Sequence, residues 1–270
     1  NIVQVSEPAR LMLLMYVASY AVRRSDELRS DFKSLMVPVG VLAAAALLLL
    51  GEPDFGAATV LFATGLGVLF LAGARIVHLL VPVVAGSIGL AALAVVSPYR
   101  LRRLTGFLDP WGDPFDSGFQ LTQSLIAIGR GEWLGVGLGA SVQKLFYLPE
   151  AHTDFVFAVL AEEFGFLGVT VVVGLFALLV TRALMISREA AQAGQAYQSY
   201  VAAAIGIWLG LQAFVNIGVN MGLLPTKGLT LPLLSYGGSS MLVTLGWIGV
   251  LLRIHHDTQA TGRVRVAPRE

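Results

Sequence analysis

The sequence predicts an all-α fold, namely a polytopic helical membrane protein with seven transmembrane helices, and three observations support this. Of the 270 residues, 56% are hydrophobic and only 13% are charged, whereas soluble domains carry about 25% charged residues. The apolar residues form seven separate runs, each long enough to cross a hydrocarbon layer about 30 Å thick. Runs such as VLAAAALLLL (41–50) are apolar on every side, which favours helices over the alternating strands of a membrane barrel.

Each apolar run is expected to form one helix. In chain order, the predicted spans cover residues 9–22, 34–51, 55–74, 77–97, 164–186, 199–223 and 238–254. Gly206 and Gly210 have the GxxxG spacing that is typical of closely packed membrane helices. We expect residues 1–257 to form a single transmembrane domain with an inserted outer-face loop, residues 98–153, and residues 258–270 to form a cytoplasmic tail.

The distribution of Lys and Arg over the connections predicts the orientation of the chain. Every second connection is basic, and these connections should be cytoplasmic. Their eleven basic residues are Arg23, Arg24, Arg29, Lys33, Arg75, Arg182, Arg188, Arg253, Arg263, Arg265 and Arg269. The C-terminus is then cytoplasmic, and residue 1 and the loop 98–153 lie on the outer side.

Charge and cysteine content exclude several classes of function. The net charge is +1, and the basic residues lie between apolar runs, so no basic face is available for nucleic acid. The chain has no cysteine, which excludes a disulfide framework, a Cys-based zinc site and a thiol nucleophile. Asn1 is not an initiator methionine, and we expect the chain to be a fragment of a longer protein.

The predicted outer loop differs most from a lipid-like composition. It combines polar groups and glycines with aromatic residues, which are Trp111, Phe115, Phe119, Trp133 and Tyr147. Amphipathic aromatic rings are favoured at the level of the lipid headgroups. We therefore expect short interfacial helices in this loop and a functional site on the outer face.

Asp154 stands where the outer loop meets an apolar run, and two interpretations of it stay open. As a helix N-cap, it accepts a backbone N–H bond and favours the positive end of the helix dipole. As a general base, with Glu150 and His152 beside it in the sequence, it takes a proton from a sugar hydroxyl after partial burial has raised its pKa.

Glu162 and Glu163 indicate where the next helix is interrupted. A single helix over residues 154–186 would be about 50 Å long and would bury both glutamates in lipid. We therefore expect a short element over residues 154–163 that ends at the glutamates, followed by a span over 164–186. The alternative is a pair of intramembrane carboxylates that acts as a proton relay.

Other polar residues near the membrane also have two interpretations each. Lys227 lies in a segment broken by prolines and glycines, where it either snorkels toward the headgroups or faces a phosphate. Glu52 and Asp54 either cap a turn or line the outer site. The basic residues Arg100, Arg102 and Arg103 either anchor the chain at the lipid headgroups or bind a pyrophosphate.

Four segments together resemble one known family. They are QVSEPARL (4–11), GEPDFG (51–56), residues 98–168 and NMGLLPTKGLTLPLLSYGGSS (220–240). Over most of residues 1–257 the chain is similar to the SEDS family (shape, elongation, division and sporulation), and more to its division branch than to its elongation branch. Family members have ten membrane helices with both termini in the cytoplasm, so the resemblance implies three further helices before these seven. The chain departs from the family's usual Gln-Pro-Ser-Glu order at Val5 and Pro8.

The resemblance implies a peptidoglycan glycosyltransferase of septal cell-wall synthesis, which polymerises lipid II at the outer face of the cytoplasmic membrane. Asp154 matches the family's essential acidic residue, so the resemblance favours the general base. An α-linked donor and a β-1,4-linked product imply inversion, for which one base and a stabilised leaving group suffice. The candidate substrate-binding residues are Lys144, Glu150, His152, Thr153, Lys227, Ser235, Arg100, Arg102 and Arg103.

The resemblance also implies partners. These are a class B penicillin-binding protein, whose transpeptidase crosslinks the glycan strands, and other division proteins. A divalent cation, Mg²⁺ or Mn²⁺, is suggested by analogy with pyrophosphate chemistry, and no residue spacing specifies its ligands. Two alternative functions are a lipid II flippase and a non-catalytic division scaffold. A flippase would distribute ionisable residues along a transmembrane path, whereas here they cluster on the predicted outer side.

Overall fold

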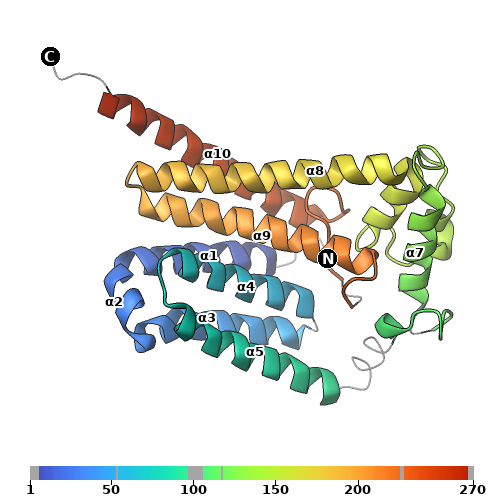
Figure 1. The fold of residues 1–270 in the computed structure, drawn as a ribbon, viewed down its shortest axis with the longest axis horizontal. Coiled ribbons are helices and arrows are strands. Elements are labelled where there is room, and N and C mark those ends of the chain that lie inside the picture. Colours follow the sequence, from blue (N-terminus) through green and yellow to red (C-terminus); the bar gives the residue numbers. More distant parts are fainter. Residues whose placement is uncertain (1–5, 53, 97–105, 117, 226–227, 267–270) are drawn as a thin grey trace. The chain divides into compact units, whose positions relative to one another are not determined.

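The computed structural model describes residues 6–52, 54–96, 106–116, 118–225 and 228–266, and within these ranges the regular secondary structure is helical, without strands. Figure 1 shows the helices in chain order. They are α1 (Ser6–Arg23), α2 (Ser25–Ser30), α3 (Phe32–Gly51), α4 (Phe55–Leu71), α5 (Ile76–Val96), α7 (Phe119–Gly131), the short π-helix η1 (Gln143–Tyr147), α8 (Val156–Gln192), α9 (Ala196–Asn220) and α10 (Gly238–Val266).

The predicted helical class is confirmed, and each predicted apolar run coincides with one helix. Among the described residues, four helices are long and apolar enough to cross a membrane, and these are Phe32–Gly51, Val156–Gln192, Ala196–Asn220 and Gly238–Ala260. Phe55–Leu71 and Ile76–Gly89 are apolar but shorter. The chain is therefore a polytopic helical membrane protein, and the number of seven spans stays a prediction. α10 continues to Val266, into the segment predicted as a tail.

The chain divides into two compact units. The first, which we call the bundle unit, contains residues 1–82, 177–211 and 238–270, and the second, the site unit, contains residues 83–176 and 212–237. The helices α5, α8 and α9 each contribute residues to both. The single transmembrane domain 1–257 with its loop 98–153 stays a prediction.

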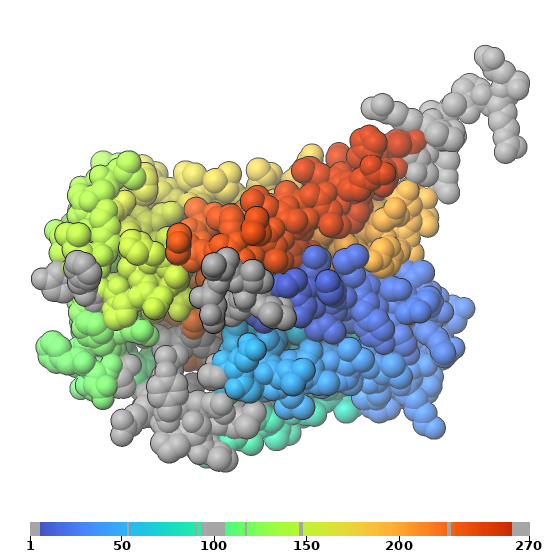
Figure 2. All heavy atoms as spheres, turned by 180° about the vertical axis from the view of Figure 1, so that it is seen from behind, coloured from blue at the N-terminus to red at the C-terminus, as the bar shows by residue number. Residues whose placement is uncertain are grey.

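In the bundle unit, helix caps fix where the first apolar helices begin. Asp31 accepts hydrogen bonds from the backbone N–H groups of Lys33 and Ser34 at the start of α3. Asp54 accepts one from the N–H of Ala57 at 2.9 Å, which confirms the capping interpretation of this residue. The helices α1, α3 and α4 pack against one another, and Figure 2 shows the atoms of α1, α2 and α3 side by side in the blue colours of the bar.

Small residues let α8 and α9 approach closely in the bundle unit. A Cβ atom added to Gly206 would lie 3.0 Å from the Cβ of Ala183, so a larger residue would push the helices apart. Gly210 faces Val180 in the same way, at 3.3 Å. The GxxxG pair is thus a packing element, as its spacing predicts. Trp208 of α9 stacks on Trp247 of α10, with ring centroids 5.3 Å apart.

In the site unit, two short helices lie within the predicted outer loop. They are α7 and η1, and their place at the membrane interface of an outer-face loop stays a prediction. Trp111 and Trp133 are 58% and 70% exposed. The position of these aromatic side chains at the lipid headgroups stays a prediction.

Helix α8 is interrupted at Gly165, next to the predicted boundary at residues 163 and 164. Gly165 has a φ of 63° and a ψ of −161°, a conformation essentially restricted to glycine. An added Cβ would lie 2.6 Å from the carbonyl oxygen of Gly131 and 2.7 Å from the backbone nitrogen of Leu134. A glycine is therefore required here both by backbone conformation and by space.

The interruption breaks helical hydrogen bonds that the loop after α7 replaces. The carbonyl oxygens of Glu162 and Glu163 accept from the N–H groups of Val136 at 2.9 Å and Gly137 at 3.1 Å. In return, the N–H of Phe166 donates to the Glu132 carbonyl at 2.9 Å, and the N–H of Leu167 donates to the Trp133 carbonyl at 3.2 Å. Backbone groups that the break would leave unpaired are thus satisfied. The loop 132–137 and the break in α8 therefore form one structure.

Candidate functional site

The turn that carries Asp154 is closed before α8 begins. Its residue Glu150 has a positive φ of 56°, which is uncommon for a non-glycine residue. The Glu150 carbonyl accepts from the N–H groups of Thr153 at 3.1 Å and Phe155 at 3.2 Å. The Thr153 hydroxyl also donates to the Glu150 carboxylate at 2.6 Å. The backbone on either side of Asp154 is thereby held.

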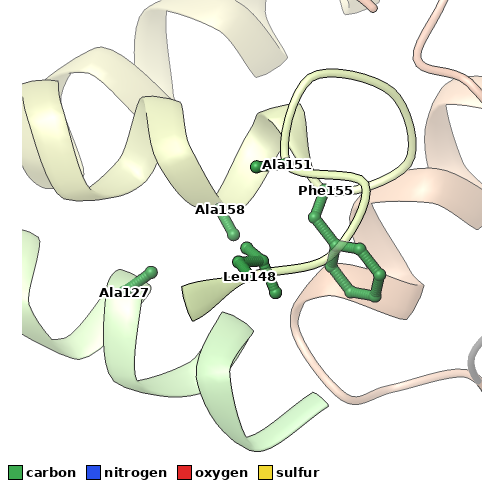
Figure 3. Packing of buried hydrophobic residues seen from close by; sticks show 5 residues of the cluster. All are labelled: Ala127, Leu148, Ala151, Phe155 and Ala158. Atoms are coloured by element: carbon green, nitrogen blue, oxygen red, sulfur yellow. The ribbon is translucent and has the colours of Figure 1, made fainter. Parts of the chain in front are cut away.

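Apolar contacts fasten the same turn to α7. Ala127, Leu148, Ala151, Phe155 and Ala158 form a buried cluster. Figure 3 shows Leu148 between α7 and the first turn of α8, with the ring of Phe155 beside it. Because the small residues Ala127 and Ala158 leave room for Leu148, the turn is held at a short distance from α7.

The segment that follows Lys227 in the sequence is hydrogen-bonded to this turn. The N–H of Tyr236 donates to the His152 carbonyl at 2.8 Å. The hydroxyl of Ser235 donates to the Thr153 carbonyl at 2.5 Å and accepts from the N–H of Leu231 at 2.7 Å. Ser235, which is buried, therefore joins the two segments through their backbones.

Helix α9 supplies further bonds to the peptide of Asp154. The Nδ2 atoms of Asn216 and Asn220 donate to the Asp154 carbonyl oxygen at 2.9 Å and 3.0 Å. The Oδ1 atom of Asn220 accepts from the N–H of Ala158 at 3.2 Å, so the first turn of α8 is capped from a different helix.

The Asp154 side chain is half-buried and directed at Gly228. A Cβ atom added to Gly228 would lie 2.8 Å from Oδ2 of Asp154, so only a residue without a side chain leaves this carboxylate in place. The backbone of this carboxylate is fixed, and the carboxylate itself is partly open to solvent. It can therefore accept a proton from a hydroxyl group bound beside it.

Glu162 is fully buried and surrounded by donors. It accepts from Arg130 at 3.3 Å, from the Ser141 hydroxyl at 2.5 Å and from the N–H of Val142 at 3.2 Å. These contacts fasten the last turn of α7 and the segment after it to α8. Buried carboxylates are tolerated when they are paired and hydrogen-bonded.

Glu163 forms an ion pair with Lys144 over 2.5 Å. Both glutamates therefore end the element before the Gly165 break, as predicted, and each is held by a basic residue from the segment 130–144. These contacts give the pair a bracing role, whereas the proton-relay interpretation has no support among them.

The structure brings most of the predicted site residues into one unit. Glu150, His152, Thr153 and Asp154 share one turn, and Ser235 contacts it directly. Glu150 and His152 are exposed and Thr153 is half-buried. Lys144 is held by Glu163, so its charge is already partnered in this arrangement. The remaining predicted residues lie outside the described ones, and these are Arg100, Arg102, Arg103 and Lys227.

Within the described ranges, the side chains provide no ready-made metal cage. They contain no group of three or more His, Cys, Asp or Glu residues placed to hold a metal ion. Magnesium is often bound by one or two carboxylates together with substrate phosphates.

The asparagines of α9 were not among the site residues predicted from the sequence. Gln212, Asn216 and Asn220 recur every four residues in an otherwise apolar helix, so they lie on one face of it. Polar residues inside a membrane segment are expensive and mark functional or buried positions. Their spacing was the available signal.

Comparisons with known proteins agree on one family. The family model for FtsW, RodA and SpoVE, described as cell cycle protein, matches residues 2–260. The probable peptidoglycan glycosyltransferase FtsW of Thioalkalivibrio sulfidiphilus is 60% identical over 97% of this chain, and that of Nitrosococcus halophilus is 59% identical over 95%. In both comparisons the chain spans 66% of the relative's length.

Two solved structures have a similar fold. One, from a study of the structural coordination of polymerization and crosslinking by a peptidoglycan synthase complex, is 32% identical, with a TM-score of 0.76 over 94% of this chain and 70% of the other. The rod shape determining protein RodA of Thermus thermophilus is 30% identical, with a TM-score of 0.59 over 94% of this chain and 66% of the other.

Proposed function

Because the chain belongs to the FtsW, RodA and SpoVE family of cell cycle proteins, we propose that it is part of a peptidoglycan glycosyltransferase that polymerises lipid II during septal cell-wall synthesis. The observation that carries the proposal is the Asp154 turn, in which the backbone next to a half-buried carboxylate accepts hydrogen bonds from side chains of two other segments, α9 and the segment that contains Ser235. The names of the relatives at 60% and 59% identity support the same activity.

In the proposed reaction, Asp154 is the general base. Its carboxylate takes the proton of the 4-hydroxyl of the acceptor sugar, and that oxygen forms a bond to the anomeric carbon of the donor. The bond from this carbon to the pyrophosphate oxygen breaks, and the lipid pyrophosphate leaves with the bonding electrons. Attack from the face opposite the leaving group converts the α-linked donor into a β-1,4-linked product.

The departing pyrophosphate carries negative charge that cations must stabilise. Lys227 is our first candidate, because it precedes Gly228 in the sequence and the Asp154 carboxylate lies against Gly228. Lys144 is a weaker candidate, because it would have to leave Glu163. Arg100, Arg102 and Arg103 complete the proposed set, since guanidinium groups bind phosphate oxygens in pairs.

A divalent cation, Mg²⁺ or Mn²⁺, is a further proposal that rests on pyrophosphate chemistry. When bound, such an ion neutralises phosphate charge. The described residues form no cage for it, and no step above depends on it.

We place the active face outside the cytoplasmic membrane, with seven spans of a ten-helix protein and the C-terminus inside. The absence of native cysteine permits a direct test in intact cells. Ser30 and Ala140 are both exposed. A cysteine introduced at Ser30 should be shielded from an impermeant thiol reagent, whereas a cysteine at Ala140 should be labelled. The opposite labelling pattern would reverse the orientation.

We further propose a class B penicillin-binding protein as partner, together with other division proteins. The similar structure that concerns polymerization and crosslinking in one synthase complex supports such a pairing. Glycan polymerisation and crosslinking would then take place in one assembly.

The decisive experiment is polymerisation of purified lipid II by the full-length protein in complex with its transpeptidase, comparing the native enzyme with Asp154→Asn. This substitution keeps the shape but removes the basic oxygen, and loss of a general base typically lowers the rate about 100- to 10,000-fold. Membrane insertion and partner binding should persist.

Asp109→Asn is the matched control, because Asp109 is exposed and caps a turn by accepting from the N–H of Gly112 at 3.0 Å. Its activity should stay within about twofold of the native value, since Asn also serves as a cap. Near-normal polymer yield from Asp154→Asn would return Asp154 to a capping role and make Glu150 the next candidate. Lipid II transport without polymer formation by the native complex would instead favour a flippase.

A further inference from the structure

Three side-chain amides lie on one face of α9 within the site unit. We call Gln212, Asn216 and Asn220 the amide ladder, because they recur every four residues and each is at most 2% exposed. Buried amides are costly unless they are hydrogen-bonded. Each of the three donates to the backbone of another segment.

Two members of the amide ladder, Asn216 and Asn220, donate hydrogen bonds to the same peptide group. Asn216 Nδ2 and Asn220 Nδ2 both donate to the Asp154 carbonyl oxygen, so both acceptor positions of that oxygen are used. Asn216 also donates to the Leu229 carbonyl through a short hydrogen bond. Gln212 donates to the carbonyl of Thr230 at 3.0 Å.

The amide ladder thus joins the Asp154 turn to the segment that begins at Gly228. Asn216 alone bridges them, because its Nδ2 contacts Asp154 on one side and Leu229 on the other. The Asp154 carboxylate lies against Gly228, the residue before Leu229. A shift of either segment would therefore move the carboxylate relative to Gly228.

We propose that Asn216 and Asn220 are positioning residues that set the place of the Asp154 carboxylate by fixing its peptide against α9 and the segment 228–230. The inference rests on the proposed function, in which Asp154 is the base. Neither asparagine takes part in proton transfer. Misplacement of a reacting group by about 1 Å can cost on the order of 100-fold in rate, so a backbone anchor at this site affects turnover.

The test compares Asn216→Leu with Ser124→Ala in the full-length, partner-bound enzyme, with purified lipid II as substrate. Asn216→Leu keeps the volume close and removes the donor to Asp154. Ser124→Ala also removes one buried hydrogen bond to α9, from the Ser124 hydroxyl to the Asn220 carbonyl at 2.8 Å, but keeps both side-chain amides that donate to Asp154. It therefore reports the effect of loosened packing alone.

We expect Asn216→Leu to lower kcat about 10- to 100-fold per folded enzyme, with KM for lipid II within about threefold of native. Ser124→Ala should leave both parameters within about threefold. Equal losses of kcat in the two variants, or a loss confined to KM, would overturn the inference. Should Asn216→Leu not fold, Asn216→Ser, which shortens the side chain but keeps it polar, is measured with the same expectation.

Gly228→Ala approaches the same carboxylate from the opposite side. Its methyl group would fall 2.8 Å from Asp154 Oδ2, and the carboxylate must turn away, because it is the movable end of a side chain. We expect a fall in kcat of at least tenfold, with the amide ladder intact. Native kcat in this variant would show that the position of the carboxylate is not critical.

The outcome for Asp154→Asn separates this inference from the proposed function. If the Asp154→Asn enzyme is active, Asp154 is not the general base, and the proposed function of this residue fails. An inactive Asp154→Asn enzyme together with fully active Asn216→Leu and Asn220→Leu would keep the base and refute the positioning role.

Discussion

Helices α8 and α9 are neighbours in the sequence, yet they are buried to opposite degrees. In the most apolar stretch of α8 only 11% of the residues are buried, whereas in α9 the share is 67%. The more apolar helix is the more exposed one. In a membrane, lipid tails are as apolar as leucine, so apolarity marks contact with lipid, and small or polar residues mark contact with other helices.

The side chains of the two helices express this difference. Leu175 and Leu178 of α8 are 60% and 59% exposed, as expected of a surface that meets lipid. In α9, Gly206 and Gly210 lie against side chains of α8, and the amide ladder is buried. Side-chain donors in α9 hold the Asp154 turn, while α8 itself provides the broken helix next to it.

We expect the largest effect from a substitution at Gly165, which tests whether the break in α8 depends on a glycine at this position. In Gly165→Ala, the Cβ would meet the backbone of Gly131, Leu134 and Gly135, and the backbone conformation itself costs about 1–3 kcal/mol for a non-glycine residue. We expect loss of the folded site unit, measured as a large fall in the thermal unfolding temperature of the purified protein.

Gly174→Ala is the control for this experiment, because the same helix has no neighbouring atom within 4 Å of the added Cβ there. This change should be neutral or stabilise the helix by up to about 1 kcal/mol. Equal stability of the two variants would show that the break in α8 is a feature of packing and not of residue 165.

An intermediate effect should follow when the same truncation is made on both helices. Leu209 of α9 is fully buried, while Leu178 of α8 is 59% exposed. Leu209→Ala should lower the free energy of unfolding by about 2–5 kcal/mol, because it leaves a cavity. Leu178→Ala should cost less than about 1 kcal/mol, since lipid fills the space.

Both variants are measured by unfolding in the same detergent without a partner. Similar losses at the two positions would mean that α8 has a protein-covered face and that the contrast between the helices is wrong.

Part of the difference between α8 and α9 can be predicted from the sequence. The apolar runs predicted the helices because length and composition decide membrane insertion. Glu162 and Glu163 predicted the interruption of α8, because two carboxylates in lipid are too costly. The structure places the break at Gly165.

The partners of these groups were beyond prediction from sequence. Lys144 forms an ion pair with Glu163, nineteen residues away, and its predicted role in substrate binding stays a prediction. Asn216 and Asn220 bind a carbonyl more than sixty residues before them. Such pairings depend on how distant segments fold together, whereas composition and spacing report only the local helix.

The smallest expected effect concerns the contact between the two helices themselves. The hydroxyl of Ser187 in α8 donates to the Ser199 carbonyl in α9 at 2.8 Å. Interhelical hydrogen bonds in membrane proteins contribute about 0.6 kcal/mol on average, because the unfolded state in the membrane also finds partners. Ser187→Ala should therefore lower the free energy of unfolding by about 0.6 kcal/mol.

Thr181→Val is the control, because the hydroxyl of Thr181 donates within α8, to the Ala177 carbonyl. Loss of this hydroxyl should leave the α8–α9 contact unchanged. A cost above about 2 kcal/mol for Ser187→Ala would mean that polar contacts, and not the close approach at Gly206, hold α8 against α9.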